Sequence, residues 1–178
     1  WAVADPAQLT WLDTPPNANF AQARELLLAL GAVDDAGRIT SRGRAMASWP
    51  AHPRVAAMLS HANGTASSDV ACTLAAILEE DGPWRGSPAD RPKDIEEALT
   101  AIETGRQKRT ASVDRGACAR VTRTRDQLMR RSDPKPKSSG TTAESIGALL
   151  ARAYPDRIAA QRGTRGRYVF VGGRAAQM

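Results

Sequence analysis

The sequence has 178 residues, a formal net charge of +6 and only 4% aromatic residues. That length suits one sizeable domain or two small ones, and an apolar fraction dominated by Ala and Leu favours helices over a β-sandwich. No signal-peptide pattern opens the sequence and no long uncharged apolar segment occurs in it, so we expect a cytoplasmic protein that does not span a membrane.

Two helices and a small wing are expected first along the chain. Asp5 has the position of an N-cap for a helix in DPAQLTWLD, which the following TPPN stops. A second helix is expected roughly from Ala18 to Leu30, with Asn17 or Asn19 as its cap, and Gly31 can take the left-handed conformation that ends it. AVDDAGRIT then predicts two short extended pieces around a Gly-containing turn.

A third helix is expected to follow the wing directly. Thr40 or Ser41 caps it, and Pro50 and Pro53 end it, because proline lacks the amide hydrogen and restricts the residue before it. Helix, helix, wing and helix together outline a winged-helix unit, which we assign to residues 1–51. Because the first helix looks cut off at the start of the sequence, we expect the chain to continue upstream in its parent protein.

The next part, residues 52–131, is expected to be a small helical bundle. Apolar residues recur at helical spacing after Pro53 and again around Leu74 and Ile77. A helix from Asp94 and a longer one over Val113 to Arg131 follow, and short helices with a single apolar stripe must pack on one another to be stable. The predicted fold class is mainly α, with a degenerate winged helix, a helical bundle and a short β segment at the C-terminus.

Residues 132–142 are a linker by composition, and residues 143–178 are expected to start a C-terminal module that the sequence truncates. Thr141 and Glu144 have the spacing of a capping box before the apolar stripe of SIGALLARAYP. RYVFVGGR predicts a strand that ends in a Gly-Gly turn. Because no partner strand is apparent after it, we expect this strand to pair with an earlier segment or a neighbouring chain, or to be poorly ordered.

Charge is distributed unevenly along the sequence. Residues 1–90 carry 6 Lys and Arg against 10 Asp and Glu, a net charge of −4, and residues 91–178 carry 19 against 9, a net charge of +10. The second half is therefore expected to attract polyanions such as nucleic acid, unless its basic surface serves only solubility.

The clearest candidate surface lies on the helix expected over VDRGACARVTRTRDQLMRR. At 100° per residue its apolar side chains form one stripe and its arginines form a second stripe beside it. This pattern suits a wall that tracks the phosphates of a single strand, although a solvated helix face has the same pattern. The helix has no aromatic residue, which predicts backbone contact without sequence preference. The candidate nucleic-acid-binding residues are Arg120, Arg123, Arg130 and Arg131, together with Arg106, Lys108 and Arg109 in the preceding loop.

Other chemistry-bearing residues are interpreted as structural. His52 and His61 have no nucleophile or paired carboxylate nearby in the sequence, and the consecutive acids Glu79 to Asp81 point in different directions on a helix. Cys72 lies in an apolar helix and is expected to be a reduced core residue. We therefore predict no catalytic, metal-binding or cofactor-binding residue in this sequence.

The stretch RITSRGRAMASWPAHPRVAAML is the most specific motif. It resembles the junction between the winged helix and the helical bundle of DEAH-type helicases, where a strand ending in Thr precedes Gly-Arg, a helix of small residues and two prolines. Gly43, Arg44, Pro50 and Pro53 occupy those positions here. DPAQLTWLDTPPNANFAQARELLLALGAVD and AYPDRIAAQRG are similar to other parts of the same helicase-associated region. The expected role of the junction is architectural, with Gly43 allowing close approach of helix and wing.

The resemblance implies an accessory region that lies C-terminal to two motor domains and couples nucleotide hydrolysis to movement along single-stranded RNA. The motor domains, with ATP and magnesium, would belong to the parent polypeptide, because this sequence has no GxxxxGK[ST] loop and no DEAH-like run. The expected partners are single-stranded RNA or DNA and the motor domains of the same polypeptide. Two alternatives are a free-standing winged-helix protein that binds duplex DNA and a docking module without nucleic-acid contact. The oligomeric state is left open.

Overall fold

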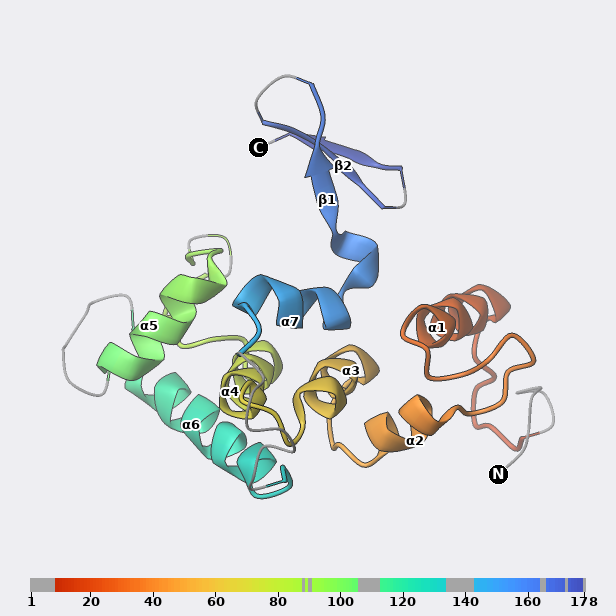
Figure 1. Ribbon diagram of the computed structural model, residues 1–178, viewed down its shortest axis with the longest axis horizontal. Helices are drawn as coiled ribbons and strands as arrows, with labels where there is room; N and C mark the ends of the chain where they lie inside the picture. Colours follow the sequence, from red (N-terminus) through yellow and green to blue (C-terminus); the bar gives the residue numbers. More distant parts are fainter. Residues whose placement is uncertain are drawn as a thin grey trace.

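A computed structural model describes residues 9–87, 89, 91–105, 113–133, 143–163, 166–171 and 173–177. In this part of the chain, helices precede a small three-stranded sheet, which confirms the predicted mainly α fold class (Figure 1). No helix among these residues is long and apolar enough to cross a membrane. The elements are α1 (Asn17–Ala29), α2 (Ser41–Ala47), α3 (Pro53–Ala62), α4 (Ser68–Glu79), α5 (Ile95–Gly105), α6 (Arg115–Met129), α7 (Ile146–Ala153), the 3₁₀ turn η2 (Pro155–Arg157), β1 (Ala159–Gln161), β2 (Arg167–Phe170) and β3 (Ala175–Gln177).

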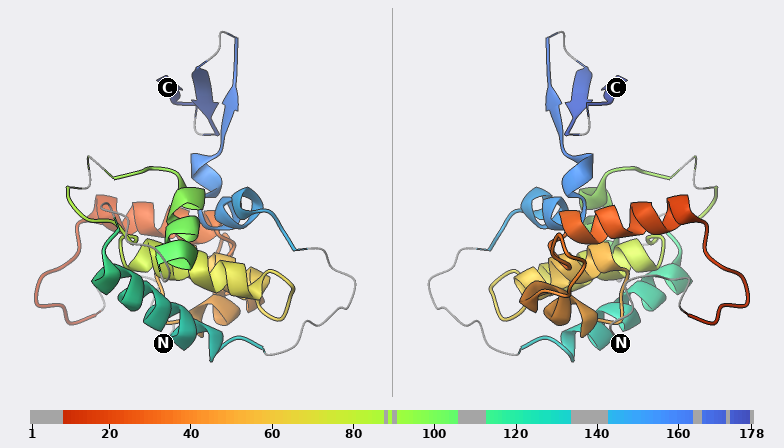
Figure 2. Two further views of the ribbon diagram at one scale, coloured as in Figure 1. Left: turned by 90° about the vertical axis from the view of Figure 1, so that its left-hand side faces the viewer. Right: turned by 90° about the vertical axis from the view of Figure 1, so that its right-hand side faces the viewer.

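The molecule has three parts in space. Helix α1, the wing and α2 lie at one end, helices α3 to α7 form a bundle, and the sheet projects from the bundle beyond α7 (Figures 1 and 2). Within the bundle α4 packs against α3, α5 and α6, and α7 packs on α3. The side chains of Met58, Leu59, Leu74, Val121 and Leu149 have an exposed fraction of at most 1%. Burying each such side chain contributes about 1.5–3 kcal/mol, so this core stabilises the bundle.

The wing is reduced to a single antiparallel bridge between Val33 and Ile39. Gly31 has a φ of +69°, the left-handed conformation predicted for the residue that ends α1. Gly37, in the turn of the wing, has a φ of +76°. These two glycines let the chain reverse twice within a few residues, which brings the wing back beside the start of α2.

The start of α2 shows why the junction contains glycine. Thr40 is the N-cap, because its Oγ1 accepts a hydrogen bond from the backbone N–H of Gly43 at 2.9 Å, and the same hydroxyl donates to the carbonyl of Gly31 at 2.7 Å. A Cβ atom at position 43 would lie 2.0 Å from the carbonyl oxygen of Ala32. The predicted close approach of helix and wing at Gly43 is therefore confirmed.

The predicted cap of α1 is wrong, and the described part of the first predicted helix is not helical. Helix α1 follows Pro16, and neither Asn17 nor Asn19 caps it; both lie inside the helix, because proline already supplies a backbone angle that suits the position before a helix. Upstream of Pro16, the residues from Leu9 onward form no helix, and the start of DPAQLTWLD lies outside the described residues.

Helix α7 does not use the predicted capping box. Ser145 is its N-cap and accepts a hydrogen bond from the N–H of Ala148 at 3.3 Å. Glu144 instead forms a tertiary contact with the side chain of His61, and Thr141 lies outside the described residues. The Glu144 carboxylate, which local spacing assigned to the cap of α7, therefore binds His61 of the distant helix α3 instead.

The prediction for the C-terminal strand is also wrong. RYVF forms β2, the centre of an antiparallel sheet with order β1-β2-β3, and both partner strands come from the last twenty residues. In register, Val169 lies opposite Ala160 on one side and Ala175 on the other. The partner strands, both of sequence AAQ, escaped the sequence analysis because alanine is depleted in strands and these short segments have no alternating pattern.

Candidate nucleic-acid interface and junction groove

Helix α6 is held in the bundle by its apolar side. Asp114 caps the helix by accepting hydrogen bonds from the backbone N–H groups of Ala117 (3.3 Å) and Gly116 (2.7 Å), and these bonds lower the pKa of its carboxyl group. Val121 and Leu128 are buried in the core of the bundle. Because packing fixes this side of the helix, the opposite side holds its polar groups at set positions.

Two arginines of α6 form ion pairs with the neighbouring helix. Nη2 of Arg125 lies 2.9 Å from Oδ1 of Asp69, and Nε of Arg120 lies 3.5 Å from Oε2 of Glu80. Arg120 was a predicted phosphate contact, and its guanidinium is directed toward this carboxylate. The sequence pattern thus grouped two kinds of arginine: Arg120, whose side chain is 55% exposed, has a carboxylate partner in the bundle, whereas the other predicted phosphate contacts of this pattern have none among the described residues.

The remaining arginines of this region are open to solvent. Arg115, Arg123, Arg130 and Arg131 are exposed, and none of their guanidinium groups makes a hydrogen bond or ion pair with another residue of the described ranges. Arg123 and Arg130 are seven residues apart, about two helical turns, so they project from the same side of α6. An exposed guanidinium without a partner inside the protein is available to a phosphate group.

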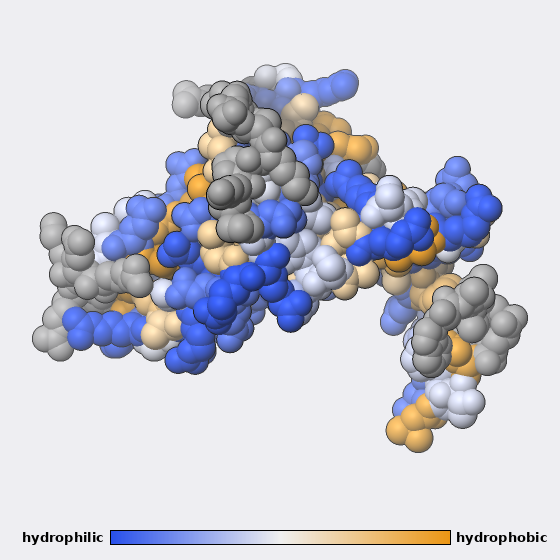
Figure 3. Space-filling view, turned by 60° about the horizontal axis from the view of Figure 1, so that its bottom comes forward, coloured by the Kyte–Doolittle hydropathy of each residue, from blue (hydrophilic) through white to orange (hydrophobic). Residues whose placement is uncertain are grey.

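Two hollows lie beside these arginines, and Arg130 borders both. One, of about 540 Å³, lies along the outer side of α6, where Arg115, Arg123 and Asp126 also line it. The other, of about 460 Å³, is shared by Arg130, Arg131 and Pro50. The space-filling view from this side shows many hydrophilic side chains around the bundle (Figure 3). The fold therefore brings the end of the basic helix next to the proline of the junction.

The loop residues Arg106, Lys108 and Arg109 lie outside the described residues. Their predicted contribution to the basic surface stays a prediction, since the structure does not place them relative to α6.

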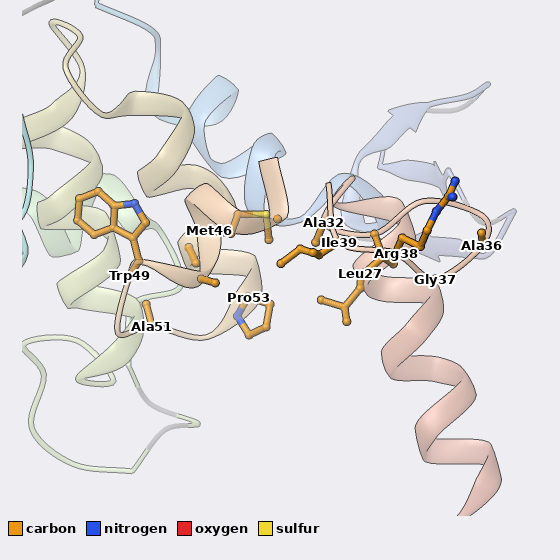
Figure 4. Close-up of a pocket in the computed structure, with 14 residues that line it drawn as sticks. Leu27, Ala32, Ala36, Gly37, Arg38, Ile39, Met46, Trp49, Ala51 and Pro53 are labelled. Atoms are coloured by element: carbon orange, nitrogen blue, oxygen red, sulfur yellow. The ribbon is translucent and has the colours of Figure 1, made fainter. Parts of the chain in front are cut away.

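A second candidate site is an open groove at the junction, with a volume of about 550 Å³. Figure 4 shows that its lining residues come from α1, the wing, α2 and the turn into α3, among them Leu27, Ile39, Met46 and Pro53. Most of the lining is apolar, and the side chain of Ile39 is 49% exposed. Helix α1, on one side of the groove, has no buried residue at all. This part of the molecule therefore presents apolar surface that no described residue covers.

The predicted junction residues divide between the two candidate sites. Gly43 and Pro53 line the groove, whereas Pro50 lines the hollow beside the basic helix. The Nη1 atom of Arg44 lies 3.5 Å from the carbonyl oxygen of Ile39, at the edge of the wing. The junction thus connects an apolar groove with a basic surface.

The histidines and acids have structural partners. Nδ1 of His52 accepts a hydrogen bond from the N–H of Arg54 at 3.3 Å, and Nε2 of His61 lies 2.7 Å from Oε1 of Glu144. Glu79 accepts a hydrogen bond from the backbone N–H of His52. Within the described ranges, no three His, Cys, Asp or Glu residues are grouped in a way that could hold a metal ion.

The two cysteines are core residues. Cys72 and Cys118 are both buried and unpaired, as predicted for Cys72. Burial raises the pKa of the Cys72 thiol to about 11, so the thiol stays protonated at neutral pH and is a poor nucleophile.

Arg54 is the functional candidate that sequence reasoning missed. Its side chain binds the carboxylate of Asp156 and the carbonyl of Ala153, which lie 102 and 99 residues further along the chain. No local pattern could have paired these residues.

The chain is similar in sequence to a known protein family and to a known helicase. Residues 23–48, which include the wing and α2, match the family described as "Helicase associated domain (HA2), winged-helix". The "ATP-dependent RNA helicase HrpB" of Escherichia coli (strain K12) is 35% identical over 180 residues, an alignment that covers 100% of this chain and 19% of HrpB. Along its whole length, this chain is similar to HrpB. The predicted resemblance to the helicase-associated region of a DEAH-type helicase is thereby confirmed.

Solved structures agree with this relationship. The crystal structure titled "E. coli DExH-box NTPase HrpB" has a TM-score of 0.63 and 32% identity, and covers 98% of this chain and 19% of that one. The structure of the "Escherichia coli DEAH/RHA helicase HrpB" has a TM-score of 0.64 and 32% identity, over 99% of this chain and 20% of that one. The chain thus spans about a fifth of the length of HrpB.

Proposed function

We propose that this chain is an accessory region of an ATP-dependent helicase, which contacts the backbone of single-stranded RNA or DNA and docks on the motor domains of its own polypeptide. The observation that carries the first part is the row of exposed arginines along α6 whose guanidinium groups have no partner among the described residues. The similarity to HrpB, a protein named as an RNA helicase, supports the same reading.

The geometry of α6 suits a phosphate-tracking wall. The helix has 15 residues, which corresponds to about 22 Å, long enough to follow several nucleotides of an extended strand. Its apolar side is packed into the bundle, so the arginines are held by a rigid element. Because α6 has no aromatic residue for stacking on bases, contacts would be made to phosphates and would not depend on base sequence.

The second part of the proposal assigns the junction groove to docking. An open apolar surface of this kind is typical of an interaction site. The occupant we propose is the motor region of the same polypeptide, because the matched relative is about five times as long as this chain and is named as an NTPase. ATP and magnesium would be bound by that region, since this sequence has no phosphate-binding loop.

The test of nucleic-acid contact is a titration of the chain with single-stranded and duplex oligonucleotides at several salt concentrations. We compare wild type with the triple variant R123Q/R130Q/R131Q, in which Gln keeps helix propensity and removes three charges. If the three arginines contact phosphates, the slope of log affinity against log salt should flatten by about 2, at roughly 0.7 per contact with a single strand.

The matched control is R24Q/R42Q/R44Q, which removes the same charge from exposed arginines of the winged-helix part. This control should leave the salt slope close to that of wild type. An unchanged salt slope in the α6 variant would contradict the proposed phosphate contact. It would favour the alternative that the chain is a docking module without nucleic-acid contact. A clear preference for duplex DNA would instead support a free-standing winged-helix protein.

A further inference from the structure

The C-terminal sheet is joined to the bundle by a narrow connection. Helix α7 is followed by Tyr154, the short turn η2 and then β1. Figures 1 and 2 show the sheet projecting from the bundle, with η2 between them. A short unsupported connection of this kind would let the sheet take many directions, because a few freely rotating backbone angles are enough to swing it.

Arg54 of α3 holds this connection with several contacts. Its Nη1 lies 2.5 Å from Oδ1 of Asp156 and its Nη2 lies 2.9 Å from Oδ2, a two-point ion pair. Nη1 also donates to the carbonyl oxygen of Ala153, at the end of α7, at 3.2 Å. The guanidinium carbon lies 5.2 Å from the centre of the Tyr154 ring. One side chain therefore contacts the end of α7, the residue after it and the turn η2.

The environment makes this contact stronger than an ordinary surface ion pair. The side chain of Arg54 is only 15% exposed, whereas that of Asp156 is 51% exposed. The hydrogen bond from Arg54 lowers the pKa of the Asp156 carboxyl group, because the positive guanidinium stabilises the ionised form. A planar guanidinium bound at two points fixes direction as well as distance.

The first turn of α3, in which Arg54 lies, is itself held in place by its neighbours. Arg54 lies in the first turn of α3, directly after Pro53 of the junction, and the next residues, Val55 and Ala56, are buried in the core. The backbone N–H of His52 donates to Glu79 at the end of α4 at 3.2 Å. This turn is therefore tied to the winged-helix part, to α4 and, through Arg54, to the C-terminal sheet.

We propose that Arg54 is a positioning residue that sets the direction of the C-terminal sheet relative to the helical bundle. The same turn of α3 follows directly on the junction from the winged helix. The sheet and the winged-helix part are therefore both attached to this turn. This role does not depend on nucleic-acid binding by α6, and it holds whether or not that binding occurs.

The test is a distance measurement by pulsed electron paramagnetic resonance between spin labels on the bundle and on the sheet. Labels are attached to cysteines introduced at the exposed positions Gln127 of α6 and Gln161 of β1, with Cys72 and Cys118 replaced by Ala. The parent protein should give one narrow distance peak. The R54Q variant should lose that peak and give a broad distribution, while circular dichroism still shows a folded bundle.

The matched control is R157Q. Arg157 also lies over the Tyr154 ring, at 5.6 Å, and carries the same charge, but it makes no ion pair with Asp156. This control should keep the narrow peak. A narrow peak in R54Q as well would overturn the proposal.

A second variant covers the case in which R54Q does not fold. D156N removes the charge of Asp156 and with it the two-point ion pair that fixes direction, while Arg54 keeps its contacts with Ala153 and Tyr154. With the bundle folded, a broadened distribution in D156N supports the positioning role. A peak as narrow as that of the parent in D156N overturns it.

Discussion

At the scale of single residues, position 43 shows how one missing side chain decides the shape of the junction. The backbone N–H of Gly43 donates a hydrogen bond to Oγ1 of Thr40, which caps the start of α2. The carbonyl of Ala32 occupies the space that a Cβ atom at position 43 would need. The requirement for glycine here comes from distance and not from backbone angle, since Gly43 is not among the residues with positive φ. Glycine at this position therefore reflects the close packing of wing and helix.

Replacing Gly43 by Ala should destabilise the protein by about 1–3 kcal/mol, because the new Cβ forces the wing away from α2. The free energy of unfolding can be measured by urea titration followed by circular dichroism. Gly147 of α7 is the control, since a Cβ there would meet nothing within 4 Å. The variant G147A should be more stable than wild type by roughly 0.5–1 kcal/mol, because Ala favours helix. Equal effects of the two substitutions would contradict the proposed crowding.

At the scale of elements, helix α7 is attached to α3 and α4 by a polar contact beside its apolar one. Leu149 and Ala153 are fully buried in the core. In addition, the backbone N–H of Glu144 donates to Oγ of Ser67 at 2.8 Å, and its carboxylate pairs with His61. The residue that local spacing assigned to capping α7 thus fixes the whole helix to its neighbours.

This contact predicts a pH dependence. The hydrogen bond with His61 lowers the pKa of the Glu144 carboxyl group, with burial acting in the opposite direction. A carboxyl group whose pKa is lower in the folded state contributes stability above its unfolded pKa, and that contribution is lost as the pH falls through the folded pKa. We therefore expect E144Q to lower the melting temperature at about pH 7 and to change it much less at about pH 3.

Melting curves of wild type and E144Q across this pH range measure the effect. The exposed acid Glu103 of α5 serves as the control, and E103Q should leave the melting temperature nearly unchanged at both ends of the range. A constant difference between E144Q and wild type at all pH values would show that the carboxylate does not stabilise the fold by its charge.

At the scale of the whole molecule, the bundle and the C-terminal sheet have separate sources of stability. The buried apolar side chains of the bundle belong to two clusters, one of which extends into the winged-helix part, whereas the sheet is held by its own strand pairing and by the connection at η2. Loss of the sheet should consequently leave the bundle folded.

The substitution V169P tests this separation, because proline at the centre of β2 removes an amide hydrogen that the ladder needs. Amide hydrogen exchange should show loss of protection in the sheet, and the melting temperature of the helical signal should change little. The variant V169A keeps the amide hydrogen and should retain most of the protection. By contrast, L74A should destabilise the bundle by about 2–5 kcal/mol, because Leu74 is completely buried. A large drop in bundle stability in V169P would show that the two parts fold as one unit.

The sequence by itself determined the features that depend on neighbouring residues. The turn at Gly31, the new helix at Pro53 and a cap at either Thr40 or Ser41 follow from interactions within a few positions, and helical periodicity placed the apolar side of α6. The structure identifies Thr40 as the cap. The same local motifs carried the resemblance to helicases that the similarity to HrpB confirms.

Only the tertiary structure decided which polar groups meet. His61 and Glu144 are 83 residues apart in sequence, Arg54 and Asp156 are 102 apart, and ion pairs with α4 separate Arg120 and Arg125 from the open arginines of α6. A long-range pair leaves no periodic or local signal, because its energy depends on packing that brings the two side chains together.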